Sequence, residues 1–253
     1  MRLEHKIAIV TGAGSGFGAG IAARFVAEGA RVLVVDRDAA AAERVAGELG
    51  ERARAVRADV AVRADVDAMI EAAYDAFGGL TTIVNNAGVG HVPQPLEGLA
   101  EDAFDRIVAV NMKAIYLVAQ AAVPRFKAAR ERGEVGASFL NVASTGGVSP
   151  RPRLTWYNAS KGWVITATRA MAVELAPFGI RVNALNPVAG ETPLLKTFMG
   201  EDTPEVRAKF LSTIPLGRFS TPEDMGHAAC FLCSDEASMI TGVALEVDGG
   251  RCI

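Results

Sequence analysis

The chain has few cysteines, few aromatic residues, no excess of basic residues and no long apolar run. Lys and Arg number 26 against 29 Asp and Glu, which gives a formal net charge of −3. Such a chain has little with which to neutralise a phosphate backbone, so we expect no nucleic-acid partner. No run approaches the roughly 20 apolar residues that a membrane helix needs. The charged start Met1–Lys6, followed by the short apolar run Ile7–Val10, does not have the form of a signal peptide, and we expect no membrane partner.

The three cysteines, Cys230, Cys233 and Cys252, cannot all pair with one another. Reduced thiols are typical of a reducing compartment, which predicts a cytoplasmic protein. Cys230 and Cys233 form a C-x-x-C pair, but the pair lies in a helical pattern and the sequence offers no second pair of metal ligands. We therefore interpret these residues as structural thiols and expect no metal site.

The hydrophobic residues make up 50% of the chain, which is enough for a sizeable core and excludes disorder. Short runs rich in Val and Ile alternate with amphipathic stretches, as in a parallel sheet buried on both faces. This alternation predicts an α/β fold with a doubly wound, parallel, seven-stranded Rossmann-type sheet and helices on both faces. The predicted strands are Ile7–Thr11, Arg31–Asp36, Ala53–Asp59, Thr82–Asn85, Ser138–Val142, Arg181–Leu185 and Ala244–Val247. The predicted helices are Gly18–Glu28, Ala39–Leu49, Val62–Phe77, Asp102–Glu131, Asn158–Ala176 and Pro222–Ser234.

No composition shift or linker divides residues 1–253, so a single domain is predicted. Two stretches, 88–99 and 186–221, are longer than strand–helix units need, and long segments often act as lids or binding loops. We assign 186–221 as the substrate loop, with a short helix at Pro204–Leu211. Four apolar residues of this loop predict either a lid over the substrate or a helix packed on its own protein. They are Leu194, Leu195, Phe198 and Met199.

The first predicted strand leads into a glycine-rich turn, Thr11–Gly18, and then into a helix. Backbone amides at such a helix start can face a pyrophosphate, and the helix dipole favours the anion. The spacing is G-x-x-x-G-x-G on Gly12, Gly16 and Gly18, which differs from the common G-x-G-x-x-G pattern. A tight turn that uses small residues for close packing is the alternative. The strand and helix on either side favour phosphate binding.

Acidic residues end the next two predicted strands. Asp36 follows Gly18 by 18 residues, where a carboxylate accepts hydrogen bonds from a ribose diol and repels a 2′-phosphate. Arg37 favours NADP instead, because it could bind that phosphate. Since the Asp36 charge lies where the phosphate would be, NAD is predicted over NADP. Asp59, followed by Val60, could bind the adenine amino group or cap the next helix.

Polar residues also follow the later strands. Asn85-Asn86-Ala87-Gly88 follows the fourth strand and Ser144 the fifth, where a doubly wound sheet binds ligands. Tyr157 and Lys161 are spaced i, i+4 at a helix start and share one face. The ammonium can lower the pKa of the phenol, so that the pair passes a proton to or from an alcohol oxygen that Ser144 orients. An isolated Y-x-x-x-K is otherwise typical of a solvated helix face.

These motifs occur together and in order, with Ser144 13 residues before Tyr157. In this combination the chain resembles the short-chain dehydrogenase/reductase family, in its single-domain branch, over essentially its whole length. The resemblance implies an NAD-dependent oxidoreductase that interconverts a secondary alcohol and a ketone. It implies that Tyr157 is the acid/base, that Lys161 binds the nicotinamide ribose and lowers the tyrosine pKa, and that Ser144 polarises the carbonyl. A homotetramer built around residues 248–250 is implied as well.

The resemblance also implies a larger set of site residues. Asn111 would hold a water in the proton relay. Where the family has Pro-Gly, this chain has Pro187-Val188 with its glycine at Gly190, while Thr192 stays in register. The cofactor contacts predicted from the residues and the resemblance together are Gly12, Ser15, Gly16, Phe17, Gly18, Asp36, Arg37, Asp59, Val60, Asn86, Ala87, Gly88, Tyr157, Lys161, Pro187, Val188, Gly190 and Thr192.

The substrate is less defined by the sequence. Arg151 and Arg153 could contact an acidic substrate or belong to a solvated loop, and His91 and Gln94 could line the pocket mouth or be ordinary loop residues. A 3-oxoacyl thioester reductase is the alternative activity, which Asp36 disfavours because biosynthetic reductases generally use NADPH. A non-catalytic cofactor-binding protein is a remoter alternative, since such a chain would be expected to lose catalytic side chains that are present here.

Overall fold

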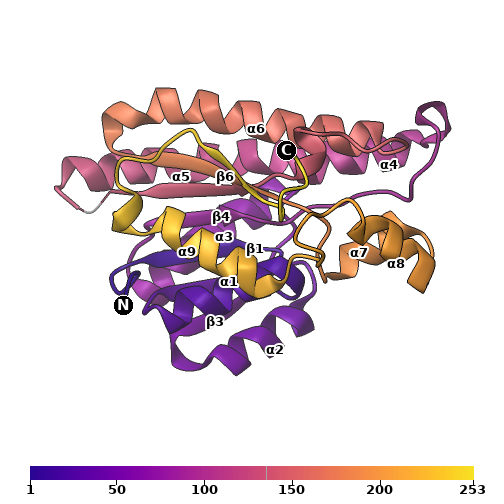
Figure 1. Ribbon diagram of the computed structural model, residues 1–253. Helices are drawn as coiled ribbons and strands as arrows, with labels where there is room; N and C mark the ends of the chain where they lie inside the picture. Colours follow the sequence, from indigo (N-terminus) through magenta and orange to yellow (C-terminus); the bar gives the residue numbers. More distant parts are fainter. Residues whose placement is uncertain (135) are drawn as a thin grey trace.

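The computed structural model describes residues 1–134 and 136–253. Seven strands form one sheet in the order β3-β2-β1-β4-β5-β6-β7, and every neighbouring pair is parallel (Figure 1). The chain starts in the middle, winds to one edge and then crosses to the other, as in a doubly wound Rossmann-type sheet. This confirms the predicted fold class. The strands are β1 (Ile7–Thr11), β2 (Arg31–Asp36), β3 (Ala53–Arg57), β4 (Thr82–Asn85), β5 (Ser138–Val142), β6 (Arg181–Pro187) and β7 (Ala244–Val247).

The strand predictions were accurate except at two ends. β3 stops at Arg57, two residues before Asp59, and β6 continues to Pro187, which pairs with Val247 of β7. The helices are α1 (Gly16–Ala27), α2 (Ala39–Leu49), α3 (Arg63–Phe77), α4 (Glu101–Ile107), α5 (Ala114–Glu131), α6 (Thr155–Leu175), α7 (Pro193–Met199), α8 (Pro204–Leu211) and α9 (Pro222–Cys233).

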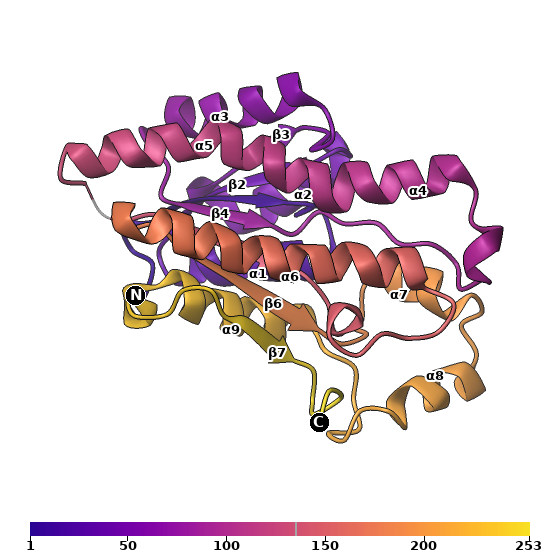
Figure 2. The ribbon, with the colours of Figure 1, turned by 90° about the horizontal axis from the view of Figure 1, so that it is seen from above.

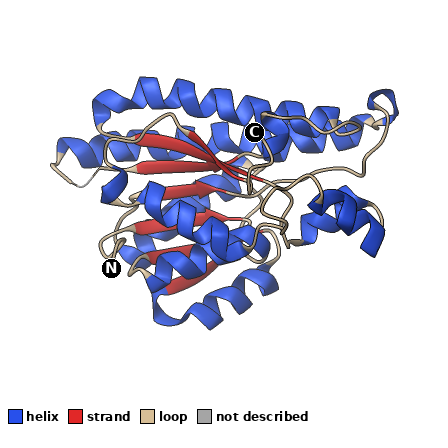
Figure 3. Cartoon of the chain, viewed as in Figure 1, coloured by secondary structure: helices blue, strands red, loops and turns tan. Residues whose placement is uncertain are grey.

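Helices cover both faces of the sheet (Figure 3). On one face, buried residues of α1, α2 and α9, such as Phe25, Val45 and Met225, form one core cluster with the strands. On the other face, α3, α5 and α6 contribute residues such as Met69 and Phe126 to a second cluster. The central strands are buried on both sides. Their sequences therefore do not alternate between apolar and polar residues but are continuous apolar runs.

The helix predicted at Asp102–Glu131 is divided in the structure. The π-helical turn Val108–Lys113 separates α4 from α5, and α5 then runs through Pro124 to Glu131. The stretch Glu101–Glu131 is also long and apolar enough to cross a membrane by length and composition, which corrects the expectation that no such run exists. Part of this stretch, including Leu117 and Phe126, is buried against the sheet, and core helices of soluble proteins pass the same test.

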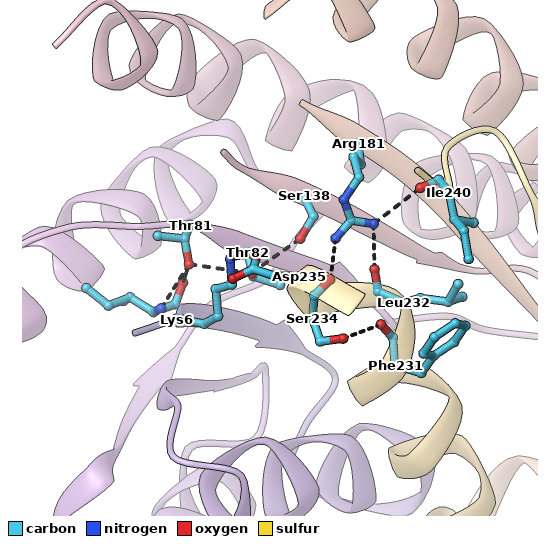
Figure 4. Close-up of polar contacts among 11 residues, drawn as sticks. Lys6, Thr81, Thr82, Ser138, Arg181, Phe231, Leu232, Ser234, Asp235 and Ile240 are labelled. Atoms are coloured by element: carbon cyan, nitrogen blue, oxygen red, sulfur yellow. Dashed lines mark hydrogen bonds and ion pairs between the residues drawn. The ribbon is translucent and has the colours of Figure 1, made fainter. Parts of the chain in front are cut away.

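The amino ends of the strands are tied together by polar contacts (Figure 4). The Arg181 guanidinium, at the start of β6, donates to the carbonyl oxygens of Leu232 (2.7 Å), Ser234 (3.0 Å) and Ile240 (3.3 Å). The first two lie where α9 ends, so Arg181 satisfies carbonyls that a helix terminus leaves free. Nearby, Lys6 Nζ lies 2.6 Å from the Asp235 carboxylate. This end of the sheet is structural, while α7 and α8 lie at the opposite, carboxyl end (Figures 1 and 2).

Candidate functional site

A cavity of about 970 Å³ lies at the carboxyl ends of the strands. Nearly all of the predicted site residues line it, although they come from turns far apart in the sequence. Gly18 and Asn111 are the two that lie behind its wall. The predicted residues that line the cavity are Gly12, Ser15, Gly16, Phe17, Asp36, Arg37, Asp59, Val60, Asn86, Ala87, Gly88, Ser144, Tyr157, Lys161, Pro187, Val188, Gly190 and Thr192.

The turn after β1 is packed directly against the turn after β4. Gly12 has a φ of +63°, and a Cβ there would lie 2.9 Å from the Ala87 Cα, so only glycine fits. The Thr11 hydroxyl accepts the N–H groups of Asn86 and Ala87, each at 3.1 Å. Gly18 lies behind this turn, where a Cβ would be 2.3 Å from the Gly12 carbonyl oxygen. Gly18 therefore lets α1 approach the turn and does not face the cavity.

The start of α1 is suited to an anion. Gly16 and Phe17, its first residues, line the cavity. Within the described residues, Ser15 at the N-cap makes no side-chain cap and the first turn holds no acidic residue. In α9, by contrast, Thr221 and Asp224 form a full capping box. The free N–H groups and the positive end of the α1 dipole are thus directed to a cavity that fits a pyrophosphate.

Two carboxylates stand at one end of this cavity. Asp36 is fixed by its neighbours, because Oδ2 accepts the Gly14 N–H and Oδ1 accepts the Asp38 N–H, both at 3.0 Å. Asp59 Oδ1 accepts the Ala61 N–H at 2.9 Å. Since α3 begins only at Arg63, Asp59 shapes the turn after β3 and does not cap that helix. Both carboxylates are placed where an adenosine would lie if a dinucleotide followed the glycine turn.

At the other end, Tyr157 and Lys161 project from the start of α6 beside Ser144. Both are buried, with 6% and 5% of their surface exposed. Lys161 Nζ donates to the Val142 carbonyl at 2.8 Å and lies 5.9 Å from the centre of the Tyr157 ring. The Ser144 hydroxyl accepts the Gly146 N–H at 3.0 Å, which fixes it at the start of the 3₁₀ turn after β5.

Burial dominates the proton affinities of this pair. It raises the pKa of Tyr157 to about 12, although a hydrogen bond with Ser144 acts in the opposite direction. It lowers the pKa of Lys161 to about 8. Each charged form loses hydration in the protein interior. In the chain alone, therefore, the tyrosine pKa moves opposite to the direction expected from a neighbouring ammonium.

Asn111 lies in the π-helical turn and connects two parts of the site. Its Oδ1 accepts the Val89 N–H at 2.9 Å, while its Nδ2 donates to the Val89 carbonyl and to the Ser160 hydroxyl, each at 3.0 Å. These bonds use the whole amide group and hold the loop after β4 against α6. The side chain thus stands behind the cavity wall, next to Gly88 and Lys161.

The departure from the family pattern at Val188 has a local explanation. A Cβ on Gly190 would lie 2.3 Å from the Phe17 ring and 2.7 Å from the Ser220 hydroxyl. The glycine is therefore needed at 190, where the chain passes closely over α1. Gly190 also pairs with Ser220 in a parallel bridge, and Thr192 packs against Gly16. The loop path keeps Thr192 at the cavity wall.

The structure shows that some apolar residues of α7 pack on their own protein, while a lid over a substrate stays a prediction. Leu195 and Met199 are buried in a cluster that the substrate loop forms with Ile214 and Phe219. Leu194 and Phe198 line the cavity, as Leu195 also does. One face of α7 thus anchors the helix and the other closes the cavity.

Several lining residues had no clear sequence signal. Of the four residues considered as possible substrate contacts, Arg151 and His91 line the cavity, whereas Arg153 and Gln94 do not. Arg106 of α4 and Phe210 of α8 were not predicted. The π-helical turn and the fold of the substrate loop bring them to the cavity, and neither feature follows from periodicity.

Comparison with known proteins agrees with this geometry. A family model described as Enoyl-(Acyl carrier protein) reductase matches residues 12–251. The chain is 50% identical over 257 residues to a 4-formylbenzenesulfonate dehydrogenase of Comamonas testosteroni, covering 100% of both. It is 39% identical over 254 residues to 2-(S)-hydroxypropyl-CoM dehydrogenase 3 of Xanthobacter autotrophicus, covering 98% of this chain and 97% of the relative.

A crystal structure of a 3-ketoacyl-(acyl-carrier-protein) reductase from Brucella melitensis complexed with NADH is also similar. It is 57% identical, with a TM-score of 0.94, and the match covers 99% of this chain and 100% of that one. Fold, site and relatives together define a nucleotide-cofactor-binding oxidoreductase. The chain belongs to the short-chain dehydrogenase/reductase family, as its sequence motifs indicated.

Proposed function

We propose that this protein is an NAD-dependent oxidoreductase that interconverts a secondary alcohol and a ketone. The observation that carries the proposal is the placement of Tyr157, Lys161 and Ser144 in the same cavity as the free start of α1. A dinucleotide with its pyrophosphate on α1 and its adenosine at Asp36 would have its nicotinamide directed toward these three residues. Relatives named as dehydrogenases support the same class of reaction.

The bound nicotinamide supplies or accepts the hydride that is exchanged with the substrate carbon. Tyr157 gives a proton to the ketone oxygen, or takes one from the alcohol, through its hydroxyl. Ser144 donates a hydrogen bond to the same oxygen. Lys161 holds the nicotinamide ribose, and its positive charge stabilises the phenolate that Tyr157 becomes after it gives up its proton.

We assign the other predicted residues to cofactor binding in the same order along the cavity. Ser15, Gly16 and Phe17 would hold the pyrophosphate, and Asp59 and Val60 the adenine. Asn111 positions the loop that carries Gly88, and the relay water expected from the family would lie on that side of Lys161. Pro187, Val188, Gly190 and Thr192 would pass over the nicotinamide.

NAD is proposed over NADP because of Asp36. Its two oxygens are held in place by backbone N–H groups, so a carboxylate stands at the end of β2 that lines the cavity. A ribose diol can donate hydrogen bonds to that group, whereas a 2′-phosphate would be repelled. Arg37 beside it is exposed, so its charge is screened by water.

We further propose that residues 1–253 form one domain with a substrate loop at 186–221, that the protein acts in the cytoplasm, and that it is a homotetramer. One sheet uses strands from the whole chain, which supports the single domain. Free thiols at all three cysteines support a reducing compartment. The tetramer rests on the family. Gly249 and Gly250 pack closely on Leu216 and Pro215 of their own chain, and their contact with a neighbouring subunit stays a prediction.

The experiment that tests the activity is an absorbance assay of the reduced nicotinamide over a panel of secondary alcohols and ketones. We expect turnover with NAD or NADH for at least one pair. Normal NADH binding without turnover of any substrate would favour the non-catalytic alternative and would contradict the proposal. A homotetramer is expected in light scattering or sedimentation of the same preparation.

The second candidate is reduction of a 3-oxoacyl thioester. The similarity to the Brucella melitensis structure favours it. The two candidates separate when acetoacetyl-CoA and a simple ketone of equal chain length are compared with NADH. A much higher kcat/KM for the thioester would select the reductase, whereas similar or lower values support the alcohol–ketone activity.

A further inference from the structure

The charged side chains of the cavity are distributed unevenly. Among the described lining residues, the carboxylates are Asp36, Asp38 and Asp59, all at the ends of β2 and β3. The half that contains Tyr157 has no lining carboxylate in the described chain. The basic lining residues are Arg37, beside Asp36, and Arg106, Arg151 and Lys161. Lys161 is assigned to the nicotinamide ribose. The acidic half is accounted for by the proposed adenosine, while Arg106 and Arg151 have no such explanation.

Arg151 is the cation whose surroundings are most informative. It is half-buried in the loop that joins Ser144 to Tyr157. Its Nη2 donates to the Thr213 hydroxyl at 3.2 Å, and its guanidinium carbon lies 4.4 Å from the centre of the Phe210 ring. No carboxylate pairs with it within the described residues.

The electrostatic environment of Arg151 is also unfavourable to its own charge. Burial and the nearby Arg251 guanidinium both lower the pKa of Arg151. A half-buried cation beside a like charge normally has an anionic partner, because desolvation without compensation is costly. Arg151 lines the cavity, so an anionic partner can come from a bound molecule.

Two further polar groups beside the cavity lack partners among the described residues. The His91 side chain is buried, with 8% of its surface exposed. Its Nδ1 lies 2.9 Å from the Val92 carbonyl oxygen, and its Nε2 has no hydrogen-bond partner among the described residues. Asn158 donates to the Arg151 carbonyl at 2.8 Å, and its Oδ1 is also unpartnered. Both atoms have almost no accessible surface, and the Asn158 Oδ1 faces Gly146, so the proposal rests on Arg151 and not on them.

We propose that Arg151 binds an anionic group, a carboxylate or a sulfonate, that the substrate carries away from its reacting carbon. This inference names the substrate class of the proposed function and rests on it. The planar guanidinium can bind both oxygens of such a group. Leu194, Phe198 and Phe210 line the same half and would contact the apolar body between the two ends.

The competing explanation is that Arg151 has only a structural role and holds α8 against the loop before α6, through its contacts with Thr213 and Phe210. Loss of such a structural contact would change kcat/KM equally for all substrates, whatever their charge. Arg153 offers a matched control, because it carries the same charge in the same loop but is exposed and does not line the cavity.

The test compares the reduction of 4-acetylbenzoate and acetophenone by NADH, two ketones that differ only in the carboxylate. In the unmodified protein, kcat/KM should be at least about tenfold higher for the carboxylate. Arg151→Met should lower kcat/KM for 4-acetylbenzoate about 10- to 100-fold, as expected for hydrogen bonds to a charged group, and for acetophenone less than about threefold. Arg151→Lys should recover part of the loss, and Arg153→Met should change neither value.

A binding measurement decides the matter independently of turnover. Calorimetry of the NADH complex with benzoate and with the neutral benzamide should show preferred binding of benzoate, lost in Arg151→Met and kept in Arg153→Met. If no ketone or alcohol reacts, the proposed function fails, while this arm still tests the anion site. The inference is overturned if Arg151→Met lowers kcat/KM equally for both ketones. It is also overturned if benzoate and benzamide bind equally or not at all, or if only the activity with acetoacetyl-CoA depends on Arg151.

Discussion

The ring of Phe198 packs on the ring of Tyr157, with centroids 4.8 Å apart and planes inclined by 56°. Phe198 is on α7, and the same ring fills the space over Gly90, where a Cβ would lie 2.5 Å from it. Because Tyr157 is only 6% exposed, the structure has α7 closed over the proposed acid/base. We infer that substrate entry moves Phe198 aside.

Replacing Phe198 by Ala should therefore widen access to Tyr157. We expect kcat/KM to rise for branched ketones, and to rise several-fold more for them than for acetone-sized ketones. The free energy of unfolding should fall by about 1 kcal/mol because the aromatic pair is missing. Steady-state kinetics over a size series measures the effect. Leu194→Ala, which trims a lining residue that does not stack on Tyr157, is the control. The same factor for ketones of all sizes would contradict the idea of a gate.

Tyr157→Phe removes one oxygen and should remove the proton transfer with it. We expect kcat to fall by a factor of at least about 10² to 10⁴, in the range of acid–base contributions. The NADH dissociation constant should change little, because the ring and Lys161 remain. Tyr116→Phe, at an exposed site on α5, provides the matched control. Retained activity in the Tyr157 variant would refute its assigned role.

Lys161 gives a pH dependence of stability with a definite sign. The pKa of Lys161 is about 8 in the fold, against an ordinary lysine value of 10.5, so between these values the unfolded chain binds more protons and stability rises with pH. At pH 7 the cofactor-free Lys161→Met protein should be more stable than the unmodified one by about 2 kcal/mol, after allowance for the lost bond to Val142.

That stability difference should shrink as the pH rises above 8 and nearly vanish toward pH 10. Urea unfolding at a series of pH values measures it. Lys209→Met, on the exposed surface of α8, should show no such trend. A difference that does not change with pH would mean that the ammonium of Lys161 is not desolvated in the fold.

Cofactor choice should depend on the charge of Asp36. Asp36→Asn removes the repulsion of a 2′-phosphate, so the ratio of the NADP and NAD dissociation constants should fall about tenfold or more, mainly through tighter NADP binding. Calorimetry with both cofactors gives the ratio directly. Asp38→Asn, which removes a charge from the next lining carboxylate, should change the ratio much less. Tighter binding of NADP than of NAD by the unmodified protein would refute the use of Asp36.

The amino end of the sheet should contribute stability without contributing activity. Arg181→Met takes away three hydrogen bonds to carbonyl oxygens, and we expect a loss of about 3 kcal/mol in the free energy of unfolding. Urea titration measures the loss, and kcat per folded molecule should stay unchanged. Arg169→Met on the exposed side of α6 is the control. A reduced kcat would show that this end is coupled to the cavity.

Much of the fold followed from the sequence because burial on both faces makes parallel strands easy to find. Every strand of the sheet was predicted, and errors of two residues occurred only at the ends of β3 and β6. These ends are decided by pairing with a neighbouring strand, as at Pro187 and Val247, which local patterns do not contain. The π-helical turn was missed for a similar reason, since Asn111 is held there by contacts with Val89 and Ser160.

The candidate site divides in the same way. Residues in short motifs at strand ends, such as Gly12 and Tyr157, were predicted because a doubly wound sheet gathers those ends at one edge. The lining of the cavity around Tyr157 depends on how α7 and α8 pack, so the inward position of Phe198 and Phe210 had no periodic signal. The raised pKa of Tyr157 was likewise unpredictable, because it reflects depth of burial and not the neighbour at i+4.

The π-helical turn at Val108–Lys113 contains one residue more than an α-helical turn would. A single inserted residue rotates everything before it by about 100° relative to everything after it. Because of that rotation, Arg106 and Val110 line the cavity, while Leu117 and Phe126 of α5 pack in the core. Deleting one residue here should give a longer regular helix and turn Arg106 away from the cavity. The lining of this side of the cavity can thus change by insertion and deletion as well as by substitution.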